Sequence, residues 1–99
     1  MTKTFDFDSW QAKLVALELA NKIGRELMKR LNVEPQTPSH LANAMGIPLP
    51  TVLFHLARLE TVGVVECRRG LGKRLREVKY YKVSSQEIVF KIGGEKNER

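Results

Sequence analysis

The segment TPSHLANAMGIPLPTVLFHLARLETVGVV, residues 37–65, carries the clearest structural signals of the chain. Thr37-Pro38 supplies a capping hydroxyl and then a proline at the first helical position, which predicts the start of a helix. Gly46 marks the expected end of that helix, and Ile47-Pro48-Leu49-Pro50 predicts a tight turn. A further helix follows the turn, carries apolar residues at spacings of four and three, and stops at Gly63. The stretch therefore predicts two short helices joined by a turn.

Two more helices are predicted before this stretch. Asp8 or Ser9 can cap the first one, and Asn21 is expected to cap the second. In the first helix, more than one face is apolar, which exceeds what a small monomer needs. We therefore expect this helix to pack against a partner subunit, and an ordinary core helix is the alternative. The residues assigned to the dimer interface are Trp10, Leu14 and Leu17.

Short strands are predicted near both ends of the chain. Residues 2–7 alternate polar and apolar, with their two phenylalanines on one face, and residues 88–92 form a second apolar run. The last residues are polar and glycine-rich. We expect one domain over residues 1–92, followed by a flexible tail at 93–99.

A β-hairpin is predicted after the last helix. Residues 64–67 and 77–83 suit its two strands, and residues 68–76 would form the loop between them. Gly70 and Gly72 are expected at the loop tip, where they would allow a close approach to a ligand. The order of helices, turn, helix and hairpin predicts an α+β winged helix-turn-helix, with about four helices, a β-hairpin wing and short terminal strands.

The predicted wing concentrates the charge of the chain. Residues 68–82 hold seven Lys or Arg residues and one acidic residue, and seven minus one gives +6, the formal net charge of the whole protein. Such a hairpin is suited to contact a phosphate backbone, and one arginine could instead enter a minor groove. The alternative is that these charged side chains form a solvated surface of the hairpin and bind no ligand. The residues assigned to phosphate contact lie in the wing 68–79 and are Arg68, Arg69, Lys73, Arg74, Arg76 and Lys79.

Length and composition narrow the classes of function. A 99-residue chain with a pI near 9.8 favours one small domain and an anionic partner, with nucleic acid ahead of a membrane surface. The single cysteine excludes an intramolecular disulfide, and no apolar run is long enough to span a membrane. The N-terminus lacks the apolar core of a signal peptide, so the expected location is the cytoplasm.

The motifs also resemble a known family. The run from Thr37 to Ile47 is similar to the positioning helix and turn of the ArsR-like (arsenical-repressor-like) regulators, and Val52 to Val65 is similar to their recognition helix and first wing strand. The resemblance covers about residues 10–92 and is closest to the small archaeal members. It implies a dimer that binds double-stranded DNA as a transcriptional regulator. The recognition helix, about residues 50–62, would enter the major groove, and the wing would follow the phosphate backbone.

Base readout by this recognition helix is the open question. With Val52, Leu56 and Leu59 facing the core, the exposed side is expected to carry Thr51, Phe54, His55 and Arg58, and the positioning helix carries Thr37, Ser39 and His40. Family members often have polar residues where Leu53 and Phe54 stand. These two side chains could contact thymine methyl groups, or be covered by another part of the protein or by a protein partner, or binding could have little sequence specificity. A winged-helix protein-interaction module that docks through Leu53 and Phe54 is the second hypothesis.

No catalytic, metal or cofactor site is predicted. The family's metal sensors often carry a Cys-x-Cys pair on the helix before the turn, and residues 38–45 contain no cysteine. Cys67 lies on the first wing strand, where a buried, inert thiol is expected over a redox switch. His40 is expected to be a surface or cap-adjacent histidine, and His55 a structural or backbone-contacting histidine, so neither is expected to bind a metal. The chain has no nucleophile elbow, phosphate-cradling loop or clustered acid–base set, so an enzyme is not expected.

Overall fold

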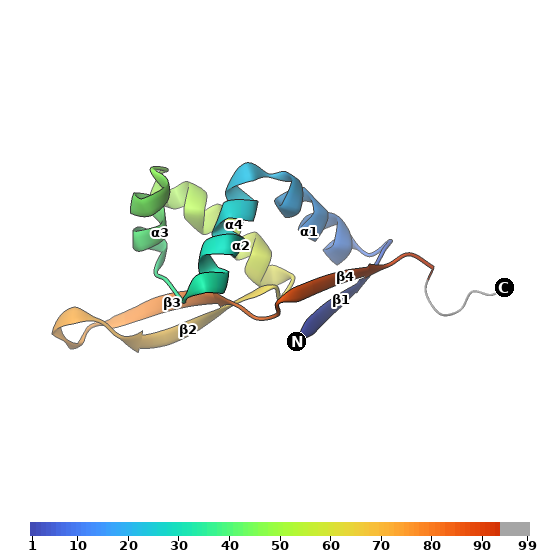
Figure 1. The fold of residues 1–99 in the computed structure, drawn as a ribbon. Helices are drawn as coiled ribbons and strands as arrows, with labels where there is room; N and C mark the ends of the chain where they lie inside the picture. The colour runs from blue at the N-terminus through green and yellow to red at the C-terminus, as the bar shows by residue number, and fades with distance from the viewer. Residues whose placement is uncertain (94–99) are drawn as a thin grey trace.

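The computed structural model describes residues 1–93, so most of the tail expected at 93–99 lies outside the described residues. In Figure 1 the helices lie on one side of the strands, and a long hairpin projects past them at one end. The predicted winged helix-turn-helix fold is confirmed. In chain order the elements are β1 (Thr2–Asp6), α1 (Trp10–Ala20), α2 (Lys22–Val33), α3 (Pro38–Met45), α4 (Leu49–Thr61), β2 (Val65–Leu71), a 3₁₀ turn (Lys73–Leu75), β3 (Glu77–Val83) and β4 (Glu87–Lys91).

The helix boundaries follow from local chemistry. Ser9 caps α1 by accepting a hydrogen bond from the backbone N–H of Ala12. Asn21 separates α1 from α2, and its side chain accepts from the N–H groups of Ile23 and Gly24. Thr37 caps α3 in the same way, and Gly46 ends that helix with a left-handed φ of 68°. The predicted starts of α1, α2 and α3 are therefore confirmed, because each depends on a side chain close in sequence.

The core lies where the four helices meet the base of the hairpin. Each helix contributes side chains from one face, and Val65 of β2 and Tyr81 of β3 add to the core from the hairpin. In Figure 1 the hairpin lies below the helices. Burial of these side chains is the main force that holds the helices against the hairpin. The most completely buried apolar residues are Val15, Leu27, Leu31, Leu41, Val52, Leu56, Leu59, Val64 and Val65.

The strands form two separate two-stranded sheets. β2 and β3 pair antiparallel from Val65 opposite Val83 to Leu71 opposite Glu77. β2 is thus longer than predicted, because residues 68–71, expected in the loop, continue the ladder with β3. β1 and β4 pair in parallel, from Thr2 opposite Glu87 to Asp6 opposite Lys91, so the first and last strands of the chain lie side by side (Figure 1).

The first strand differs from the sequence prediction. Phe5 is buried and stacks on Phe90 of β4, with ring centroids 6.0 Å apart. Phe7 was expected on the same face but is exposed, because β1 ends at Asp6 and the chain turns there to enter α1. Within residues 1–93, no helix is both long enough and apolar enough to cross a membrane.

Candidate nucleic-acid interface

The wing has two chemically different faces, because neighbouring residues along a strand point to opposite sides. One face carries Tyr81 at its base, buried against the core, and continues outward with Arg69 opposite Lys79. The other face carries Arg68 opposite Tyr80 and then Gly70 opposite Val78. The face that packs on the helices near the base therefore becomes a basic face farther out along the hairpin.

The wing glycines have a role that differs from the one predicted. Gly70 lies inside β2, and a Cβ there would be 3.1 Å from the ring of Tyr80. A Cβ on Gly72 would be 2.9 Å from Val78. Both glycines therefore make room for side chains of the opposite strand. The prediction that they form the loop tip is wrong.

Three other residues form the tip itself. The turn Lys73–Leu75 joins the strands, and it is closed by a 2.7 Å hydrogen bond from the N–H of Gly72 to the carbonyl of Arg76. Arg74 and Leu75 adopt φ values of 62° and 60° in this turn. Residues other than glycine rarely adopt this left-handed conformation, so the backbone of the turn is strained at these two residues.

Carboxylates oppose part of the basic charge of the wing. Arg69 pairs with Glu77 at 3.2 Å, and Glu66 lies 3.3 Å from Arg68 and 3.5 Å from Lys82. These are exposed pairs that a phosphate can replace at small cost. Among the described residues, the exposed Arg74, Arg76 and Lys79 have no carboxylate within ion-pair distance; the side chain of Lys73 lies outside the described part.

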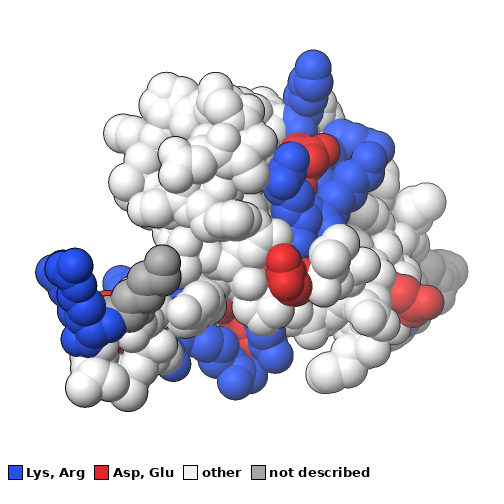
Figure 2. Space-filling model, turned by 60° about the vertical axis from the view of Figure 1, so that its left-hand side comes forward, with Lys and Arg blue, Asp and Glu red and all other residues white. Residues whose placement is uncertain are grey.

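From the start of α3 to the middle of α4, the helix-turn-helix carries no formal charge, and its charged residues, Arg58 and Glu60, lie near the end of α4. Residues 35–57 contain no Asp, Glu, Lys or Arg. In Figure 2 a broad white lobe lies above the basic wing tip, and other blue side chains gather apart from it. The positioning helix α3 follows this pattern: Ser39 and His40 are exposed, and Thr37 is occupied as the helix cap. Over residues 35–57, the exposed side chains that this unit could offer to a nucleic acid are therefore neutral, and Arg58 follows directly after them.

The outer face of α4 carries exposed apolar side chains, and an arginine of the same helix packs against one of them. Leu53 is 43% exposed and Phe54 is 55% exposed, while Thr51 and Arg58 are half-buried. The Arg58 guanidinium lies 5.1 Å from the centre of the Phe54 ring, a distance typical of a cation–π contact. Arg58 thus orients Phe54 from one helical turn away.

The prediction that His55 lies on the exposed side of the recognition helix is wrong. His55 is buried, and its Nδ1 lies 2.8 Å and 3.0 Å from the two carboxylate oxygens of Glu18. Glu18 is only 1% exposed and also lies 3.1 Å from the Nε of Arg58, though not in hydrogen-bond alignment. Burying a carboxylate costs free energy unless the group is paired. The contacts with His55 and Arg58 therefore stabilise the buried Glu18 side chain.

This ion cluster of Glu18, His55 and Arg58 joins α1 to α4, and it was not among the predicted functional sites. Its signal was a single acidic residue in the otherwise apolar run Leu14-Val15-Ala16-Leu17-Glu18-Leu19-Ala20. Gly24 of α2 completes the site, because a Cβ there would collide with the backbone and side-chain oxygens of Glu18. Glu18 therefore occupies the junction of three helices.

Two of the residues assigned to a dimer interface lie on an open face of α1. Trp10 is 58% exposed and Leu17 is 59% exposed, and Leu14 is half-buried. The opposite face of α1 carries Ala12, Val15 and Glu18 into the protein. The helix therefore presents a second apolar face that the described residues do not cover.

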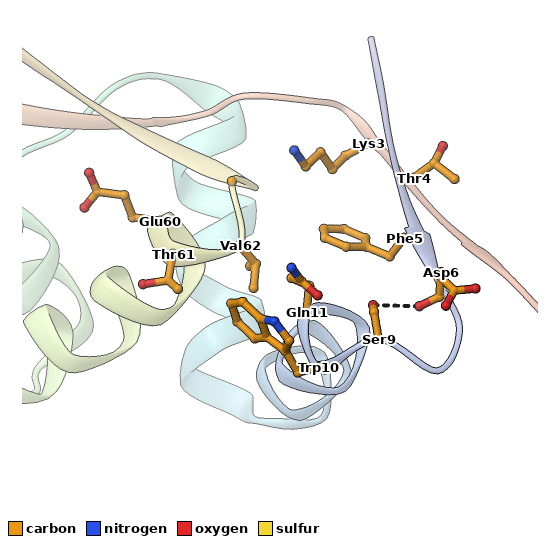
Figure 3. A pocket seen from close by; sticks show the side chains of 11 residues that line it. Lys3, Thr4, Phe5, Asp6, Ser9, Trp10, Gln11, Glu60, Thr61 and Val62 are labelled. Atoms are coloured by element: carbon orange, nitrogen blue, oxygen red, sulfur yellow. Dashed lines mark hydrogen bonds between the residues drawn. The ribbon is translucent and has the colours of Figure 1, made fainter.

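A pocket of about 490 Å³ lies between β1, the start of α1 and the end of α4. Figure 3 shows Trp10 and Phe5 on its wall, with Lys3 and Glu60 at opposite sides. The Ser9 hydroxyl donates to the Asp6 carbonyl at 2.7 Å, which fixes the entry to α1. The lining of this pocket includes both basic and acidic side chains, so it indicates no single class of ligand.

Cys67 and Tyr81 lie opposite each other at the base of the wing. Burial raises the pKa of the Tyr81 phenol above its ordinary value of 10.0, and the neighbouring Cys67 and then Glu60 add to that shift. Cys67 is half-buried and has no second cysteine to pair with. Within residues 1–93, no group of three His, Cys, Asp or Glu side chains is arranged to hold a metal ion.

The chain is similar in sequence and in fold to known proteins. The sequence model of a family described as a helix-turn-helix domain matches residues 19–68, and no curated protein matches the chain. NolR from Sinorhizobium fredii is 25% identical with a TM-score of 0.65, over 78% of this chain and 72% of that one. Mb0332 from Mycobacterium bovis is 28% identical with a TM-score of 0.64, over 77% of this chain and 66% of that one. It is described as a homodimeric winged helix-turn-helix DNA-binding domain of a possible ArsR-family regulator.

A more distant structure extends the likeness in fold. HlyU from Vibrio cholerae is 20% identical with a TM-score of 0.63, over 83% of this chain and 84% of that one. The family match covers about half of the chain and includes the complete helix-turn-helix unit together with the start of the wing. The chain therefore belongs to the helix-turn-helix domain family, and its fold is the winged helix-turn-helix of the ArsR-like transcriptional regulators.

Proposed function

We propose that this protein is a homodimeric transcriptional regulator that binds double-stranded DNA. The observation that carries the proposal is the basic hairpin: exposed, projecting beyond the helices, and adjacent to a helix-turn-helix unit (Figures 1 and 2). The description of Mb0332 as a homodimeric DNA-binding domain supports it. In this proposal the wing residues Arg68, Arg69, Lys73, Arg74, Arg76 and Lys79 neutralise phosphates.

The recognition helix α4 would lie in the major groove and read it through apolar contact. Phe54 and Leu53 are the most exposed large apolar side chains of this helix, ahead of Leu49, and the cation–π contact with Arg58 orients Phe54. The only apolar group on a base edge in the major groove is the thymine methyl. We therefore propose thymine contacts for these two residues, with Thr51 beside them, and exclude His55 because it is buried.

Dimerisation would use the open face of α1. Trp10 and Leu17 are exposed apolar side chains on one helix, with Leu14 between them, and a partner helix would remove them from water. A dimer also places two wings on one duplex, which doubles the number of phosphate contacts. Two recognition helices on successive major grooves would then require half-sites about one helical turn apart.

A salt titration tests the wing. The triple substitution Arg69→Ala, Lys73→Ala and Arg74→Ala should weaken binding to every duplex and flatten the plot of log Kd against log salt. The slope falls by about 0.9 for each phosphate contact that is lost. The matched control replaces three exposed lysines outside the wing, Lys22, Lys29 and Lys91, by alanine and changes the net charge equally. An unchanged slope in the wing variant would exclude phosphate contact by the wing.

A selection experiment distinguishes DNA binding from the alternative function as a protein-interaction module. The intact protein is mixed with random-sequence duplexes at a low and a high salt concentration, and the retained DNA is sequenced. Enrichment of a motif supports a sequence-specific regulator, and weak uniform retention supports non-specific binding. Absence of retention at low salt would remove the DNA proposal and leave the apolar surface at Leu53 and Phe54 as a protein contact.

A further inference from the structure

The wing ends in exposed leucines set among arginines. Leu71 closes β2 and is 69% exposed, and Leu75 lies in the tip turn and is 79% exposed. Arg74 and Arg76 flank Leu75 and are themselves exposed. One surface leucine needs no explanation, but an apolar end on a basic hairpin is poorly suited to phosphate contact alone.

The backbone of the tip holds Leu75 away from the hairpin. Its φ of 60° places it in the left-handed region, and the hydrogen bond from Gly72 to Arg76 closes the turn around it. The hairpin satisfies its own apolar contacts without this side chain, since Val78 packs over Gly72 and Tyr80 packs over Gly70. Leu75 therefore lies at the apex, with nothing in the described residues to bury it.

We propose that Leu75 is an apolar wedge that enters the minor groove of duplex DNA and opens a base step, so that the wing bends the duplex. This inference rests on the proposed DNA binding and extends it to the shape of the bound DNA. Arg74 and Arg76 supply the charge that brings the tip to the phosphates on either side of the groove. Leucine is among the side chains that minor-groove proteins insert between base pairs, and such insertion kinks the duplex.

The wedge has a consequence for sequence preference. Pyrimidine–purine steps such as TA unstack easily, whereas A-tracts are stiff and have a narrow minor groove. A wedge therefore favours duplexes with TA steps. An arginine that entered the groove by charge alone would favour A-tracts, because a narrow groove has the stronger negative potential. The two modes of wing contact predict opposite preferences between duplexes of the same base composition.

The test uses the full chain and two duplexes that differ only at their centres, TATATATA in one and AAAATTTT in the other. Dyes at the two ends report bending by energy transfer. The wild-type protein should bind the TA duplex more tightly and raise the energy transfer. Leu75→Ala should keep the salt slope, lose the preference between duplexes and leave the energy transfer at the value of free DNA. Leu75→Met, which keeps an apolar reach, should restore the bend.

Val33→Ala is the matched control, because Val33 is 81% exposed at the end of α2 and lies outside the wing. It should behave as the wild type does. A bend of equal size with Leu75→Ala, or a wild-type preference for the A-tract, would overturn the wedge while leaving DNA binding intact. Failure of the wild type to bind either duplex at low salt would instead overturn the proposed function and the wedge together.

Discussion

Removal of the Glu18 carboxylate should destabilise the protein strongly. Glu18 is 1% exposed, and Glu18→Ala would leave the Nδ1 of His55 without its acceptor in a site where the imidazole is 9% exposed. An unsatisfied buried donor costs about 1–3 kcal/mol, and breaking a buried ion pair costs about 3–5 kcal/mol. Arg58 is 27% exposed and regains water, which favours the lower end of the range. We expect a loss of about 3 kcal/mol in the free energy of unfolding.

The measurement is urea denaturation at one fixed protein concentration, since dimerisation would contribute to the apparent stability. Glu26→Ala is the matched control: Glu26 pairs with Arg30 at 2.9 Å on α2, but that pair is partly exposed, with side chains 43% and 34% accessible. Such a pair contributes about 0–1 kcal/mol. If Glu18→Ala destabilised the protein no more than Glu26→Ala does, the assignment of Glu18 as the ion that joins α1 to α4 would be refuted.

Two further substitutions test the packing around this site and the base of the wing. Gly24→Ala should destabilise the protein by about 1–3 kcal/mol in urea, because the new methyl group meets the Glu18 carbonyl; a gain of about 1 kcal/mol, as at an ordinary helical glycine, would contradict this. Tyr81 has a raised pKa, so its contribution to stability is complete below pH 10.0 and is lost as pH rises through the folded-state pKa. Tyr81→Phe should lose less stability above pH 10.0 than the wild type does, and identical losses would exclude the phenol as the cause.

The wing changed most between sequence and structure. Its charge could be counted along the chain, but the pairing of Lys82 with Glu66 and of Arg69 with Glu77 depends on the register of β2 against β3. The positions of the glycines also differ from the prediction. Side chains of the opposite strand pack over Gly70 and Gly72, and Arg74 and Leu75 lie in the tip turn instead. Register is a property of two strands together, so neither strand's sequence specifies it alone.

The helix boundaries and the type of fold could be predicted from the amino-acid sequence alone. Thr37, Pro38 and Gly46 act through hydrogen bonds and backbone angles within a few residues, and these interactions are the same whatever surrounds the helix. The spacing of Val52, Leu56 and Leu59 likewise fixed the inner face of α4. Local chemistry of this kind is readable because its partners are adjacent in the chain.

Which polar side chains remain exposed, and so available for function, depends on the packing of elements that are distant in the sequence. His55 and Glu18 are 37 positions apart, and their hydrogen bond withdraws His55 from the surface that the spacing of α4 had assigned to it. The parallel pairing of β1 with β4 and the exposure of Leu75 were decided in the same way. Each depends on how distant elements pack, because burial makes an unpaired charge costly and determines which face remains in contact with water.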